Sequence, residues 1–176
     1  KYFFEALVDS VFSTISYLKQ KKYNSIILNY DEYSDHLFRW YQQLVAESLG
    51  KKSKGIMPII STMPKDNHSM MQLYLDGPKN SFFTFFDFLE KKKNFKSSGL
   101  ILDTHYYLKN KSLNDIKSAQ KEATKQVFSK KKIPYRSFHL LNRSESSLGE
   151  LFTFFMLETI SLGTFLKVNP FDQPSV

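Results

Sequence analysis

Apolar residues follow two patterns along this chain. Some recur with the spacing of a helix, and others form short continuous runs of strand length. The first part of the chain shows the helical pattern most clearly, because its large apolar residues repeat every three or four positions. These residues are Phe4, Leu7, Val8, Val11, Ile15 and Leu18. The pattern predicts an amphipathic helix over residues 1 to 20, closed by the lysines that follow.

Strand-length runs then alternate with further helical stretches. The predicted strands cover residues 25–30, 56–60, 81–88 and 135–141, with a further short run at 99–102. The predicted helices between them cover residues 35–49, 66–75, 112–130 and 148–166, and Ser112 with Asp115 matches a capping box. Strands alternating with helices predict an α/β fold, a three-layer α/β/α sandwich with a mostly parallel sheet of about five strands. Residues 1–176 then form a single domain.

Composition supports a packed globule and narrows its chemistry. Apolar residues make up 41% of the 176 residues and aromatic residues 16%, which disordered chains do not reach. The chain has no cysteine, so disulfides and thiolate ligands are excluded. The apolar stretch at 148–166 contains Glu150 and Glu158, which would be costly in a membrane, and is interpreted as a buried core helix.

The net charge of +8 could indicate nucleic acid, an acidic membrane surface or an anionic substrate as partner. The lysines fall in separate short runs beside the ends of predicted elements, at residues 19–22, 51–54, 91–93 and 130–132. Scattered runs are more typical of solvated loops than of a nucleic-acid footprint. We therefore expect neither nucleic acid nor a membrane as partner. The lack of cysteine is compatible with a cytoplasmic location, which we also expect.

Motifs for cofactors are absent from the sequence, and two polar residues remain as candidates. No Gly-rich phosphate loop occurs, and the four histidines lack metal-ligand spacing. Glu47 lies one turn before the end of its predicted helix, near the negative end of the helix dipole, where a carboxylate could serve as a general base. His68 begins the helix after the second strand. A solvated glutamate and a surface histidine are the ordinary alternatives.

The final run, residues 163–176, contains the compact loop Asn169-Pro-Phe-Asp-Gln-Pro174. Its two prolines fix the backbone around Asp172 and Gln173. Polar side chains held rigidly on a loop suit ligand binding, although a stiff surface turn would have the same sequence.

Three segments together resemble one family, the glucose-6-phosphate isomerases, and match its second sugar-isomerase (SIS) domain. They are residues 40–51 (WYQQLVAESLGK), residues 66–78 (DNHSMMQLYLDGP) and residues 163–176. The resemblance departs from the usual family pattern at Ser61-Thr62, Asn67 and Ser175. The family's first SIS domain, with its phosphate loop and active-site arginine, has no counterpart here, nor do the glutamate and lysine expected beyond Val176.

The resemblance implies interconversion of glucose 6-phosphate and fructose 6-phosphate through a cis-enediol, without metal or organic cofactor. Glu47 matches the base that moves a proton between C2 and C1. His68 matches the histidine that assists ring opening, which the family supplies across a homodimer interface, and Gln173 matches a substrate-contacting glutamine. The chain would be the C-terminal domain of a longer two-domain enzyme, and alone it should be nearly inert. A noncatalytic SIS module that binds sugar phosphates for regulation or assembly is the alternative.

Overall fold

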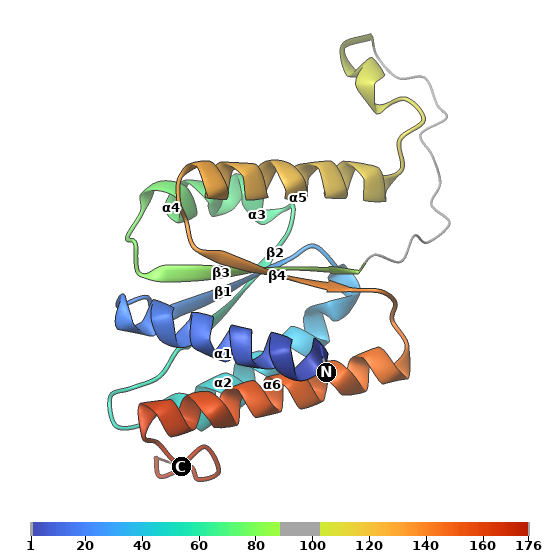
Figure 1. The fold of residues 1–176 in the computed structure, drawn as a ribbon. Helices are drawn as coiled ribbons and strands as arrows, with labels where there is room; N and C mark the ends of the chain where they lie inside the picture. The colour runs from blue at the N-terminus through green and yellow to red at the C-terminus, as the bar shows by residue number, and fades with distance from the viewer. Residues whose placement is uncertain (1, 89–102, 176) are drawn as a thin grey trace.

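A parallel four-stranded sheet lies between two layers of helices in the computed structural model, which describes residues 2–88 and 103–175 (Figure 1). The strands are β1 (Asn24–Asn29), β2 (Met57–Thr62), β3 (Ser81–Phe88) and β4 (Tyr135–Leu140), in the spatial order β2-β1-β3-β4. The helices are α1 (Tyr2–Lys19), α2 (Asp35–Leu49), α3 (Asp66–Ser69), α4 (Met71–Asp76), α5 (Leu113–Lys130) and α6 (Glu145–Leu166). The predicted three-layer α/β/α fold is confirmed, while the suggested strand at 99–102 lies outside the described residues.

Each face of the sheet carries its own apolar core, because successive side chains of a strand point to opposite faces. Ile27, Phe82 and Phe86 pack with α1, α2 and α6 on one face. On the other face, Phe83 and Phe85 contact Phe128 of α5, with ring centroids 4.8 and 5.5 Å apart. Both faces are therefore covered, which explains why the strands are continuous apolar runs in the sequence.

The helix α1 has the predicted type and position, but its buried face differs from the predicted one. That face contains Leu7, Ser10, Thr14 and Leu18. Phe4 and Val8, predicted on the inner face, are 64% and 49% exposed. Small polar residues occupy the buried face instead, because Ser10 donates to the buried Glu158 of α6 and Thr14 accepts from Arg136 of β4.

A buried ion pair and its hydrogen bonds join four elements, β4, α6, α1 and β3. Arg136 of β4 donates to Glu158 of α6 at 2.5 Å, and the hydroxyl of Ser10 in α1 donates to the same carboxylate oxygen at 2.6 Å. Arg136 also donates to Ser10 and, at 3.0 Å, to Thr84 of β3. Burial, and secondarily the charge of Glu158, raises the pKa of nearby Tyr41 to about 12. The polar residues that interrupt the helical pattern of α1 are thus parts of one satisfied network.

Helix α6 begins at Glu145, three residues before the predicted start, because the side chain of Ser144 caps it. By length and composition α6 could cross a membrane. One face of it is nevertheless buried against the sheet layer, through residues such as Leu151, Phe155 and Leu162. The other face exposes Leu148 and Met156. The prediction of a core helix is confirmed for the inner face.

Candidate functional site

Glu47 lies on the last turn of α2, at the edge of the sheet where the strands begin, which we call the amino edge. Helix α2 follows the end of β1 and returns to the start of β2, and β1 and β2 are parallel. The end of α2 is therefore at the amino edge, opposite the carboxyl edge where α/β folds usually bind ligands. The terminal loop after α6 arrives at the same edge, because α6 follows β4 and runs back along the sheet (Figure 1).

The structure brings Glu47 and Gln173 together although 126 residues separate them. The amide of Gln173 donates to Oε2 of Glu47 at 2.9 Å. The amide of Gln43, one turn earlier in α2, donates to Oε1 at 2.9 Å. Both oxygens of an exposed carboxylate thus accept a neutral donor, which fixes its orientation while leaving it open to solvent. Such a group can exchange a proton with a ligand placed against it.

Lys51 holds the terminal loop against the end of α2. Its side chain is only 6% exposed, and its ammonium group pairs with the carboxylate of Asp172 at 2.9 Å. The same ammonium donates to the carbonyl of Asn169 at 2.6 Å and to the carbonyl of Asp172. The hydrogen bond from Lys51 holds the pKa of Asp172 below its ordinary value. Gln173, the next residue, is positioned by this attachment.

Close packing against α6 fixes the other side of the loop. A Cβ atom on Gly163 would lie 3.3 Å from the ring of Pro170, so a larger side chain there would press on the loop. The side-chain oxygen of Asn169 accepts from the backbone N–H of Phe171 at 3.1 Å, which closes a turn. The prolines, the glycine and Lys51 together make the loop a rigid support for Gln173.

His68 lies elsewhere in the molecule. It is on α3, which follows the carboxyl end of β2 and belongs to the opposite helix layer from α2. Asp66 ties this short helix to the strand, because its carboxylate accepts from the hydroxyl of Ser61 at 2.9 Å and from the N–H of Thr62 at 2.8 Å. Two of the three predicted site residues, Glu47 and Gln173, therefore lie in contact within a single chain. The third, His68, lies on the other face of the sheet.

Two residues of this site were not predicted from the sequence. Lys51 belongs to a lysine run that the sequence pattern assigns to solvated loops, yet it is buried. Gln43 carries no signal beyond its spacing of four residues from Glu47, which places both on one helix face. Within residues 2–88 and 103–175, no three His, Asp or Glu side chains gather in a way that could hold a metal ion.

Comparisons with known proteins agree with the resemblance seen in the sequence, although no protein-family model matches the chain. A glucose-6-phosphate isomerase of Mycoplasmopsis pulmonis is 37% identical over 174 residues, covering 94% of this chain and 40% of that protein. A glucose-6-phosphate isomerase of Methanocaldococcus jannaschii is 31% identical, and the match covers 91% of this chain and 39% of that protein. The chain thus spans about 40% of the length of these curated relatives.

Two solved structures are also similar. The crystal structure of a hypothetical protein from Thermus thermophilus matches with a TM-score of 0.84 and 27% identity, covering 93% of this chain and 41% of that one. A glucose-6-phosphate isomerase from Chlamydia trachomatis matches with a TM-score of 0.66, and the match covers 86% of this chain and 32% of that one. At 17% identity the second match shows a shared fold only.

Proposed function

We propose that this chain, which is similar to glucose-6-phosphate isomerases over nearly its whole length, is the C-terminal SIS domain of an enzyme that interconverts glucose 6-phosphate and fructose 6-phosphate. The observation that carries the proposal is the Glu47–Gln173 contact, which joins two of the three segments of the resemblance at one surface. Because the chain spans about 40% of these relatives, the rest of the site would come from sequence outside it. We place the enzyme in the cytoplasm, where charged sugar phosphates are retained.

In this proposal Glu47 is the base of the isomerisation. Its carboxylate takes the proton from C2 of the open-chain aldose, which gives the cis-enediol, and returns a proton to C1, which gives the ketose. Both transfers use the same oxygen if the carboxylate keeps its orientation, and the two amides on Oε1 and Oε2 supply that constraint. Gln173 would exchange part of this contact for a substrate hydroxyl. No metal or organic cofactor takes part.

The position of His68 supports a homodimer as the active form. Within one copy it lies across the sheet from Glu47, so it cannot assist ring opening at that site. A second copy can present its His68 next to the first copy's Glu47. The proposed active site is thus shared between subunits, and a chain with Glu47 replaced should complement one with His68 replaced.

Replacing Glu47 with Gln in the full-length parent protein tests the base assignment. The amide keeps the size of the side chain but cannot take the proton, and either Gln43 or Gln173 must turn its own amide to accept from it. Turnover should therefore fall about 10²–10⁴-fold or more, while the thermal unfolding temperature of this exposed site changes little. Reduction of NADP by an added glucose-6-phosphate dehydrogenase reports isomerisation of fructose 6-phosphate. Glu150→Gln, another exposed helix glutamate, is the matched control.

Turnover by Glu47→Gln within a few fold of the control would rule out Glu47 as the base. Binding of glucose 6-phosphate by a wild-type parent that shows no isomerisation would instead favour the noncatalytic module.

A further inference from the structure

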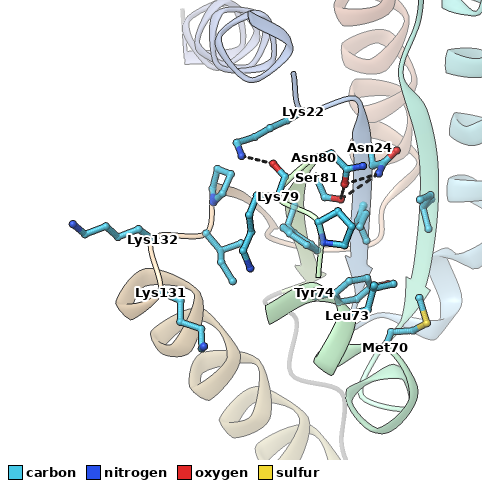
Figure 2. Close-up of a pocket in the computed structure, with 16 residues that line it drawn as sticks. Lys22, Asn24, Met70, Leu73, Tyr74, Lys79, Asn80, Ser81, Lys131 and Lys132 are labelled. Carbon is cyan, nitrogen blue, oxygen red and sulfur yellow. Dashed lines mark hydrogen bonds between the residues drawn. The ribbon is translucent and has the colours of Figure 1, made fainter. Parts of the chain in front are cut away.

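A hollow of about 390 Å³ opens at the amino edge of the sheet, between α4 and the end of α5 (Figure 2). It lies on the helix layer opposite α2, so the sheet separates it from Glu47 and Gln173. Its volume falls within the range of small-molecule pockets, about 300–1,000 Å³. The function proposed above makes no use of it.

The floor of the hollow is apolar and comes from three neighbouring strands and their surroundings. Ile59 of β2, Ile26 of β1 and Phe83 of β3 lie side by side in the sheet, and Tyr74 of α4 forms a wall. The rings of Tyr74 and Phe83 meet edge to face with centroids 5.2 Å apart. A flat apolar group placed here would contact aliphatic and aromatic side chains that are already fixed by the core.

The rim carries positive charge from segments far apart in the sequence. The hollow is lined by Lys22, Lys79, Lys131 and Lys132, and none of the described residues that line it is Asp or Glu. Two lysine runs that are scattered in the sequence, 19–22 and 130–132, therefore converge here. Figure 2 shows Lys22 reaching across to Lys79. The ammonium group of Lys22 donates to the backbone carbonyl of Lys79 at 2.8 Å, while Lys132 points outward.

Compensation of helix dipoles does not account for this charge. The lysines follow the C-terminal ends of α1, α4 and α5, and the ammonium group of Lys79 donates to the carbonyl of Leu75 at the end of α4. Each helix end carries about −0.5 elementary charge, so three ends offset fewer than two of the four lysines. Each ammonium group also has three donors, and the contacts of Lys22 and Lys79 with backbone carbonyls use one donor each. The rim thus keeps charge and donors for an anion.

We propose that this hollow binds a small organic phosphate whose aromatic ring fills the apolar floor while the phosphate contacts the lysines. A sugar phosphate fits less well, because hydroxyl groups placed over Ile59 and Phe83 would lie without partners there, which is costly, while the polar side chains of the lining, Asn24, Asn80 and Ser81, already bond one another. Inorganic phosphate would leave the floor empty and would gain only the screened contacts of the rim. The site is therefore distinct from the proposed substrate site.

The test uses 4-fluorophenyl phosphate as the probe, observed by fluorine NMR with the full-length parent protein. Saturating glucose 6-phosphate is present throughout, so that any sugar-phosphate site is occupied. We expect the probe to bind at least about tenfold more tightly than 4-fluorophenol or inorganic phosphate, because it alone has both the ring and the charge. Lys79→Met and Ile59→Gln should each weaken binding by several fold. Lys111→Met, before the other end of α5, should leave it unchanged.

Lys79 is a surface residue, so its variant keeps the test valid even if Ile59→Gln does not fold. The proposal is overturned if the probe does not bind, or if Lys79→Met and Lys111→Met bind it equally. It is also overturned if inorganic phosphate displaces the probe as well as phenyl phosphate does, or if raising glucose 6-phosphate displaces it. Displacement by the sugar phosphate would assign the probe to the substrate site.

Discussion

Replacing Lys51 with Met should release the terminal loop from the end of α2. Methionine has nearly the same length and keeps the apolar contacts of the lysine stem, but it removes the ammonium group that holds Asp172 and the carbonyl of Asn169. Gln173 would then lose its fixed position beside Glu47. The change therefore tests whether one buried charge organises the proposed site.

The size of the effect follows from the contacts of the ammonium group. We count only its hydrogen bond to the Asn169 carbonyl, which gives a lower bound because the ammonium group also donates to the carbonyl of Asp172. The carboxylate of Asp172 is left out because it is half exposed and its attraction is screened by solvent. A hydrogen bond to a charged donor contributes about 2 kcal/mol, which corresponds to a roughly 30-fold larger population of the detached loop. Hydrogen exchange of a peptide covering residues 167–175, measured by mass spectrometry in the parent protein, should accelerate by about that factor.

The pH dependence of the same exchange has a definite sign. Hydrogen bonding from Lys51 lowers the pKa of Asp172 in the folded chain. A carboxylate whose pKa is lower in the folded than in the unfolded chain stabilises the fold at pH values above its unfolded pKa. This stabilisation is lost as the pH falls through the folded pKa. The attachment of the loop should therefore be unchanged from neutral pH to about pH 5 and weaken only slightly in stronger acid, below the ordinary aspartate range near 3.9, because the hydrogen bond from Lys51 to Asn169 remains.

Lys52→Met is the matched control, because Lys52 is an exposed neighbour in the same turn. Isomerase turnover of Lys51→Met should fall, because the loop positions the base, and the KM for fructose 6-phosphate should rise, because Gln173 contacts the substrate in this proposal. Equal exchange rates in the two variants would refute the assignment of Lys51 as the residue that holds the loop. Fast exchange with full turnover would show that the loop does not position Glu47.

Two further predictions concern the buried network beneath the sheet. Glu158→Gln should lower the free energy of unfolding by about 3–5 kcal/mol in chemical denaturation, because it leaves the buried Arg136 without its counter-charge; a loss below about 1 kcal/mol would contradict this. The pKa of Tyr41 is about 12 in the folded chain, against about 10 for an ordinary tyrosine in the unfolded chain. Its contribution to stability should therefore be complete below about pH 10 and be lost as the pH rises from there towards 12. Tyr41→Phe should flatten this alkaline loss, and an unchanged slope would contradict it.

The sequence by itself determined the order and type of the elements. Strand-length apolar runs and helical spacing are local properties, so they indicated the parallel α/β/α fold, and Ser112 with Asp115 marked a helix start that the structure confirms. The similarity to glucose-6-phosphate isomerases was also readable, because it rests on short segments in a fixed order. Local pattern was less reliable in α1, where a partner in α6 decides which face is buried.

Only the tertiary structure decided which of the candidate residues meet. Glu47 and Gln173 share a hydrogen bond because α2 and α6 both end at the amino edge, whereas His68 follows a strand to the other edge and the other face. The burial of Lys51 and the convergence of separate lysine runs around one hollow have the same origin. Contacts between residues distant in sequence depend on the path of the chain through the sheet, and no local pattern encodes that path.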